Sequence, residues 1–184
     1  MTGPTPAPSG FAALSEDIVY EGWILKVARG HFRAPDGSTF ERDVVHHPGA
    51  VAVVPLIDDD IVLVRQYRSA LDDFLLEIPA GLRDISGEPP IETAQRELIE
   101  EIGMRANTLT PLAAVHNSAG FSDEQIHLFI GTDLVDVGRQ MTTSPEEVEM
   151  EIVRLPLAEA GRMITSGELT DAKTIIGVLA ALAN

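Results

Sequence analysis

Residues 81–104 read GLRDISGEPPIETAQRELIEEIGM, and they hold the clearest structural signals in the chain. Pro90 stands just ahead of a helical pattern at residues 91–104, and proline is favoured in the first turn of a helix. Gly103 lies near the end of the pattern, where helices commonly stop. The sequence therefore predicts a helix that follows a loop rich in glycine and proline.

The predicted helix separates its acidic residues from its apolar ones. At about 100° per residue, Glu97, Glu100 and Glu101 share one narrow face. A separate apolar stripe suits packing into a core, and it comprises Ile91, Ala94, Leu98 and Ile102. Arg96 can reach Glu92 and Glu100, but neither Glu97 nor Glu101 has a basic residue within one turn on its face. Such carboxylates suit a hard cation, and a solvated acidic face is the alternative.

Strand patterns flank this helix on both sides. Predicted strands cover residues 17–32, 39–47, 51–57, 61–67, 74–78, 109–115, 125–132 and 148–155, and predicted helices cover residues 157–166 and 170–182. This order favours an α+β layer fold over a βαβ repeat. Because residues 34–38, APDGS, favour a tight turn, the first two strands should form an antiparallel hairpin. We expect a flexible tail at 1–13, an N-terminal β subdomain at 14–47 and a main domain at 48–184.

Composition excludes several classes of protein. The 184 residues include 13 Lys plus Arg and 29 Asp plus Glu, for a net charge of −16, which argues against binding nucleic acid or an anionic membrane surface. The absence of cysteine excludes disulfides and thiolate chemistry. The apolar runs are shorter than the ~20 residues that a membrane-spanning helix needs. We therefore expect a cytoplasmic protein.

The segment at 81–104 resembles the signature of the Nudix hydrolases. From Glu88 onward every fixed position of that signature is matched, by Glu88, Arg96, Glu97, Leu98, Glu100, Glu101, Gly103 and Met104. One departure lies upstream, where six residues instead of five separate Gly81 from Glu88. We expect a one-residue bulge in the loop at 84–87 to absorb the difference.

Three further segments resemble the ADP-ribose pyrophosphatase branch of this family. They are EIPAG at 77–81, RQYR at 65–68 and AGFSDE at 119–124, the last with Ala119 where that branch usually has proline. The resemblance implies a Nudix-type α/β/α sandwich with a mixed sheet and an N-terminal antiparallel β hairpin subdomain. It also implies a homodimer formed through that subdomain.

The resemblance implies metal-dependent hydrolysis of ADP-ribose to AMP and ribose 5-phosphate. Glu97, Glu101 and the Ala80 carbonyl would bind Mg²⁺ or Mn²⁺, and Glu100 would hold a further metal or a metal-bound water. Arg96 would tether a neighbouring carboxylate. The alternatives are another nucleoside diphosphate derivative as substrate, such as a nucleotide sugar, NADH or an oxidised nucleotide, or a sensing module without catalysis.

The resemblance also implies a base and a substrate site. Glu147 is the first choice for the general base and Glu146 the second, while a solvated loop acid is the alternative. The implied substrate-binding residues are Trp23, Arg42, Arg65, Arg68, Phe121, Ser122 and Asp123. The alternative roles are surface ion pairs for the arginines and a core or interface position for the tryptophan.

Overall fold

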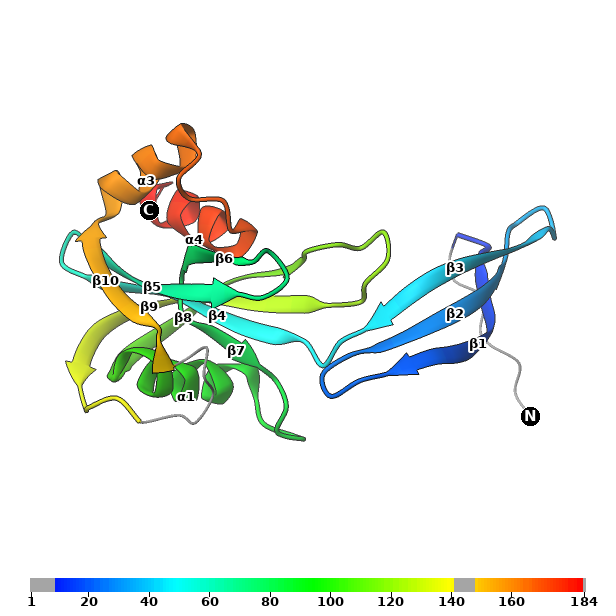
Figure 1. Cartoon of the computed structure of the whole chain (residues 1–184), viewed down its shortest axis with the longest axis horizontal. Coiled ribbons are helices and arrows are strands. Elements are labelled where there is room, and N and C mark those ends of the chain that lie inside the picture. The colour runs from blue at the N-terminus through cyan, green and yellow to red at the C-terminus, as the bar shows by residue number, and fades with distance from the viewer. Residues whose placement is uncertain (1–8, 141–147, 184) are drawn as a thin grey trace. The chain divides into compact units, whose positions relative to one another are not determined.

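The computed structural model describes residues 9–140 and 148–183 and divides into two compact units (Figure 1). The first unit consists of Met1–Gly49 and His116–Glu124, and the second of Ala50–Val115 and Gln125–Asn184. The segment at 116–124, which connects two strands of the second unit, therefore belongs with the N-terminal strands. Each unit is described by itself below.

The first unit is a three-stranded antiparallel sheet in the order β1-β2-β3. Its strands are β1 (Ala12–Glu21), β2 (Lys26–Arg33) and β3 (Thr39–His46). The prediction of one continuous strand at 17–32 is wrong, because the chain reverses after β1 in a turn where the Gly22 amide donates to the Leu25 carbonyl at 2.9 Å. The predicted turn at 34–38 is present, with Gly37 at a φ of 87°. β1 begins at Ala12, inside the range expected for the tail.

The second unit contains a seven-stranded mixed sheet. The strands are β4 (Ala50–Ile57), β5 (Asp60–Arg68), β6 (Asp73–Glu77), β7 (Ala80–Leu82), β8 (Met104–His116), β9 (Gln125–Asp136) and β10 (Glu151–Pro156). Their order is β10-β5-β4-β9-β8, with β6 paired to β5 and β7 paired to β4. β4 and β9 run parallel, whereas β4 pairs antiparallel with β5 and β7, so the predicted mixed sheet is confirmed.

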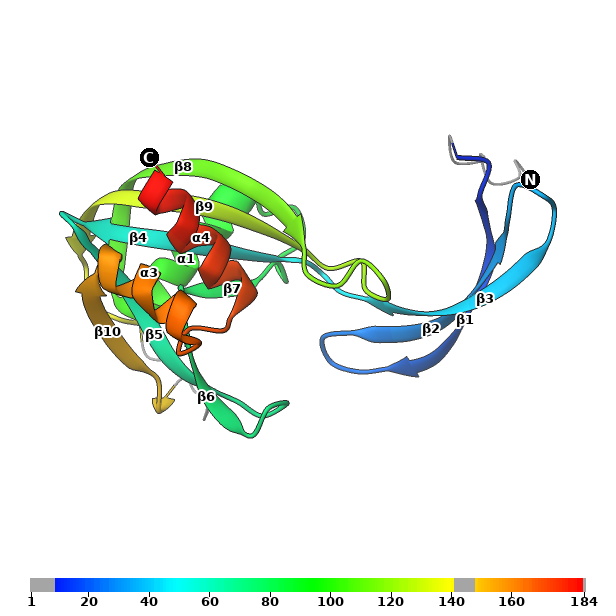
Figure 2. The same cartoon turned by 90° about the horizontal axis from the view of Figure 1, so that it is seen from above.

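Three helices cover the sheet of the second unit. They are α1 (Pro90–Ile102), α3 (Leu157–Ser166) and α4 (Ala172–Ala183). α1 lies on one face, and α3 and α4 lie on the other (Figures 1 and 2). The expected sandwich of helices around a mixed sheet is thereby confirmed. No helix within 9–140 and 148–183 has the length and apolar character needed to cross a membrane.

α1 has the ends that its sequence predicts. Pro90 occupies the first turn, and Gly103 takes the left-handed conformation at a φ of 70° while its amide bonds the Ile99 carbonyl. Leu98 and Ile102 pack into the core between α1 and the sheet. Ile91, predicted to belong to the apolar stripe, is exposed because it lies in the first turn beyond that core. α1 is therefore anchored from Thr93 and Ala94 onward, and Glu97 and Glu101 are among its buried residues.

Candidate active site

The two predicted metal-binding carboxylates of α1 are buried against the short strand β7. Glu97 and Glu101 are only 8% and 6% exposed, whereas Glu100 is partly exposed. The Ala80 amide donates to Glu101 Oε2 at 2.9 Å. Burial of acidic side chains is costly unless they are paired or bind a cation. The alternative of a solvated acidic face is therefore wrong for Glu97 and Glu101.

Gly81 makes room for the Glu97 carboxylate. A Cβ atom at this position would lie 2.0 Å from Glu97 Cδ and 2.2 and 2.3 Å from its two carboxylate oxygens. Any side chain at position 81 would therefore have to displace the carboxylate. The contact gives a physical reason for glycine at the start of the motif, other than backbone flexibility.

Arg96 stands at the centre of a cluster of acids. Its Nη1 donates to Glu97 Oε1 at 2.7 Å and to Glu100 Oε2 at 3.3 Å. The second contact confirms the predicted pairing with Glu100. The prediction that Glu97 has no basic partner nearby is wrong, because the long Arg96 side chain folds back onto its sequence neighbour. Arg96 thus fixes the orientation of two of the predicted metal ligands.

The loop between Gly81 and Glu88 contains a turn at residues 85–88, in the part where the sequence predicts a bulge. The Glu88 amide donates to the Ile85 carbonyl at 3.1 Å, and Gly87 has a φ of 82°. Glu88 still meets the helix, since its Oε2 accepts from Thr93 Oγ1 at 2.8 Å and from Arg96 Nη2 at 3.3 Å. These bonds lower the pKa of Glu88, and the bond from Thr93 contributes most.

The electrostatics of the cluster fit a divalent cation. One guanidinium, that of Arg96, lies within 3.5 Å of four carboxylates, those of Asp84, Glu88, Glu97 and Glu100. Burial raises the pKa of Glu97 to about 7; Arg96 opposes this rise, and the charge of Glu100 adds to it. The carboxylates are hard oxygen donors with a surplus of negative charge, which is the donor set that Mg²⁺ and Mn²⁺ select.

In the part of the chain that the structure describes, no three acidic or histidine side chains converge into a metal cage. Mg²⁺ keeps several water molecules and is usually held by one or two carboxylates together with substrate phosphates. The fit therefore rests on Glu97, Glu101 and Glu100 with the Ala80 backbone, and not on a closed cage.

Two of the predicted phosphate-binding arginines lie on β5. Arg68 donates through Nε and Nη2 to the two carboxylate oxygens of Glu77, each at 2.6 Å, and thereby leaves its Nη1 edge outside that pair. Arg65 lies 4.2 Å from the centre of the Phe74 ring and 3.7 Å from Glu151. Both the ion-pair alternative and a role toward phosphate are compatible with these contacts. The predicted bases Glu146 and Glu147 lie outside the described residues.

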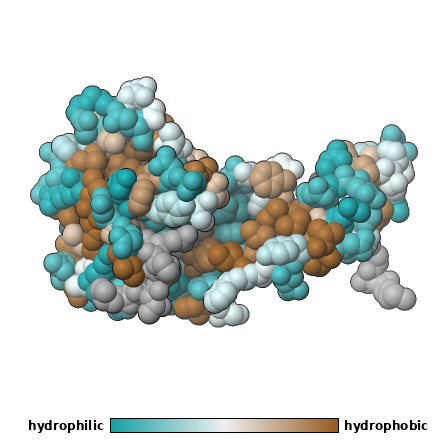
Figure 3. Space-filling view, in the orientation of Figure 1, coloured by the Kyte–Doolittle hydropathy of each residue, from teal (hydrophilic) through white to brown (hydrophobic). Residues whose placement is uncertain are grey.

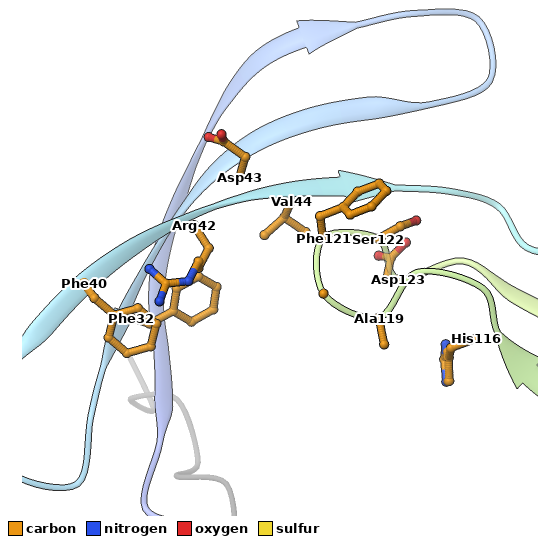
Figure 4. Close-up of a pocket in the computed structure, with 11 residues that line it drawn as sticks. Phe32, Phe40, Arg42, Asp43, Val44, His116, Ala119, Phe121, Ser122 and Asp123 are labelled. Atoms are coloured by element: carbon orange, nitrogen blue, oxygen red, sulfur yellow. The ribbon is translucent and has the colours of Figure 1, made fainter. Parts of the chain in front are cut away.

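Four of the remaining predicted substrate residues line one cavity in the first unit. The cavity has a volume of about 500 Å³ (Figure 4). Its lining includes Arg42, Phe121, Ser122 and Asp123, together with Phe32, Phe40, Asp43, Val44, His116, Ala119 and Gly120. The sequence analysis did not identify Phe32 and Phe40, which face each other across β2 and β3 and stack with ring centres 5.5 Å apart. Their signal was an aromatic pair flanking the turn at 34–38.

Trp23 lies apart from this cavity lining, in the turn between β1 and β2. Its side chain is 99% exposed, which makes it the most exposed large apolar residue among those described. A core position for Trp23, one of the alternatives from sequence, is therefore wrong for this chain by itself.

His46 connects three segments of the first unit. Its Nδ1 lies 2.6 Å from Asp123 Oδ2, and its Nε2 lies 2.9 Å from Glu16 Oε2 on β1. Asp123 also accepts from the His47 amide at 2.9 Å. The hydrogen bond to Asp123 and then that to Glu16 raise the pKa of His46, despite some opposing desolvation. His46 thus links the 116–124 segment to β3 and β1.

The His46→Gln variant is expected to lose stability mainly at low pH. Because the pKa is higher in the folded state, the stabilisation is complete below the unfolded value of about 6.5 and is lost as pH rises through the folded value. Thermal unfolding across this range should show the deficit in Tm shrinking toward alkaline pH. His127→Gln is the control with the opposite sign, since burial lowers the pKa of His127. The Tm of wild type should therefore decrease relative to that of His127→Gln as pH drops. A His46→Gln deficit that is independent of pH would contradict the ionic role.

Comparisons with known proteins identify a matching family and several similar chains. The NUDIX domain family matches residues 46–176. An "ADP-ribose pyrophosphatase" from Mycobacterium tuberculosis is 41% identical over 95% of this chain and 84% of its own length. An "ADP-ribose pyrophosphatase" from Bacillus subtilis is 34% identical over 90% of this chain and 89% of its own length. A solved structure of an "ADP compounds hydrolase" superposes with a TM-score of 0.82 at 23% identity, covering 97% of this chain and 96% of that one.

Proposed function

The chain belongs to the NUDIX domain family, and we propose that it hydrolyses the pyrophosphate of ADP-ribose to AMP and ribose 5-phosphate. The observation that carries the proposal is the burial of Glu97 and Glu101 against the Ala80–Gly81 backbone, with Arg96 as the counterion. The substrate assignment draws on the two relatives named ADP-ribose pyrophosphatase, which this chain matches over most of both lengths.

Nudix hydrolases depend on a divalent metal, and we propose Mg²⁺, or Mn²⁺ in its place. Glu97, Glu101, Glu100 and the Ala80 carbonyl would hold it. When bound, such an ion neutralises pyrophosphate charge and lowers the pKa of bound water. Arg96 keeps Glu97 and Glu100 oriented through its hydrogen bonds. Gly81 keeps the space that the Glu97 carboxylate needs.

In the proposed reaction a water oxygen attacks one phosphorus of the pyrophosphate, and the bond from that phosphorus to the bridging oxygen breaks. A carboxylate takes the proton from the attacking water, with Glu147 as the first choice for this base and Glu146 as the second. The bridging oxygen leaves on the second phosphate. One product is AMP and the other is ribose 5-phosphate.

The basic residues supply charge for the phosphates. We propose that Arg68 binds phosphate through Nη1 while Glu77 holds the other edge of its guanidinium. Arg65 on β5 is the second candidate. Arg42 and the segment Phe121, Ser122 and Asp123 are proposed to contact the nucleoside or ribose parts, since they line the cavity of the first unit.

We further propose that the chain forms a homodimer through the N-terminal β subdomain at 14–47. Apolar side chains of β1 and of the turn after it are exposed, and Figure 3 shows apolar surface over the three-stranded sheet. The exposed side chains include Ile18, Val19, Tyr20, Trp23 and Ile24. Exposed apolar patches of this kind mark interaction sites, and Trp23 is proposed to stack on the adenine there. The cytoplasmic location stays a prediction.

The proposal is tested by measuring AMP release from ADP-ribose with Mg²⁺, beside a panel of nucleotide sugars, NADH and oxidised nucleotides. ADP-ribose is expected to give the highest kcat/KM. Faster turnover of another compound would keep the reaction type and overturn the substrate. Binding of metal and ADP-ribose without any turnover would favour the sensing module.

A further inference from the structure

The segment from Glu77 to Gly81 is held between two helices that lie on opposite faces of the sheet (Figure 1). On the α1 side, the Ala80 amide bonds Glu101, and Gly81 packs directly against the Glu97 carboxylate. Every proposed metal ligand except Glu100 is therefore in this segment or touches it.

On the other side, the same segment is bonded to the C-terminal helix α4. The Ile78 amide donates to Thr174 Oγ1 at 2.8 Å. Lys173 Nζ donates to Glu77 Oε2. Gly177 permits close approach of the helix, since a Cβ there would lie 2.6 Å from Val54 Cγ2 and 3.4 Å from Ile78 Cδ1. α4 thus contacts the segment through a side-chain hydroxyl and a charged side chain.

These contacts form a buried and electrically balanced network. Glu77 is 1% exposed and Lys173 is 8% exposed. Two bases, Arg68 and Lys173, face two acids, Glu77 and Asp171. Burial would raise the pKa of Glu77, but Arg68 and Lys173 outweigh it and hold the pKa below its usual value. Removal of Lys173 would leave the buried Glu77 and its neighbour Asp171 with Arg68 as their one base, which favours rearrangement of the segment.

The chain between the two sets of contacts is short and stiff. Only Pro79 separates Ile78, bonded to α4, from Ala80, bonded to α1. The ring of Pro79 fixes its φ angle, and its carbonyl accepts from the Val53 amide of β4 at 2.9 Å. A displacement imposed at Ile78 is therefore transmitted to Ala80, since few soft torsions remain to absorb it.

We propose that Lys173 and Thr174 of α4 are positioning residues for the metal site, acting through Glu77 and Ile78 on Ala80 and Glu101. The inference rests on the proposed function, because it takes Ala80 and Glu101 as metal ligands. It makes the C-terminal helix part of the active-site support, although no residue of α4 lies in the motif at 81–104.

The test measures Mn²⁺ binding to the full chain by electron paramagnetic resonance, without nucleotide. Lys173→Met and Thr174→Val are expected to weaken Mn²⁺ binding by about tenfold, in the range found for residues that orient metal ligands. The Mg²⁺ activation midpoint should rise in parallel. KM for ADP-ribose at saturating Mg²⁺ should stay unchanged in Thr174→Val, because Thr174 does not bond the Arg68–Glu77 pair. Thr174→Ser keeps the hydroxyl and should restore wild-type binding.

The controls separate positioning from general stability. Arg154→Met removes an ion pair with Asp60 on β5, at 2.7 Å, and should leave Mn²⁺ binding unchanged. If Lys173→Met fails to fold, Thr174→Val decides alone, because valine keeps the shape of threonine. A lower Tm with unchanged Mn²⁺ binding in Thr174→Val would overturn the proposal. A wild type that binds Mn²⁺ but does not turn over ADP-ribose would instead overturn the proposed function.

Discussion

Replacing Glu101 by glutamine is expected to lower kcat/KM for ADP-ribose by about a thousandfold, which corresponds to about 4 kcal/mol of lost charge stabilisation. The change removes one negative charge from a buried position beside Glu97. It preserves the fold, because the amide oxygen of glutamine still accepts the hydrogen bond from the Ala80 amide. Steady-state kinetics of AMP release over a range of Mg²⁺ concentrations measures the effect.

Glu92→Gln is the matched control for this experiment. Glu92 lies on the same helix and is exposed in its first turn. The same chemical substitution there should leave kcat/KM close to that of wild type. If both variants lost activity equally, the net charge of α1 would be responsible, and Glu101 would not be a specific ligand.

The acidic half of the site follows from the sequence because helical geometry is local. The spacing of Glu97, Glu100 and Glu101 fixes their direction once the helix forms, and Gly103 ends that helix where predicted. The pairing of Arg96 with Glu97 does not follow from it. Helical spacing places Cα atoms, whereas the end of an arginine side chain can fold back onto the next residue.

Contacts between distant segments were beyond the sequence analysis. Lys173 and Glu77 are 96 residues apart, and no local pattern records that a buried lysine on α4 neutralises a buried acid at the end of β6. The third strand of the N-terminal sheet was missed for a related reason. Apolar residues at 23–25 continue the strand pattern, and only Gly22 hints at the reversal.

Replacing Gly81 by alanine is expected to lower kcat/KM by about a hundredfold, the loss associated with a displacement of about 1 Å in a catalytic group. The new Cβ would lie 2.0 Å from Glu97 Cδ, whereas carbon atoms in contact are separated by about 3.5–4.0 Å. The backbone of Gly81 itself can accept alanine, since its φ is not in the left-handed region. The whole cost therefore falls on the Glu97 carboxylate, and kinetics together with Mn²⁺ binding measures it.

A double-mutant cycle with Glu97→Ala shows whether the alanine acts through that carboxylate. Removing the Glu97 side chain clears the space that the new methyl group needs, so Gly81→Ala should cost almost nothing further in this background. Gly131→Ala is the control for crowding in the core, since its Cβ would meet Val53 Cγ1 at 3.1 Å. It should lower Tm without weakening Mn²⁺ binding. Additive losses in the cycle would mean that Gly81 is needed for the path of β7, and that its contact with Glu97 is incidental.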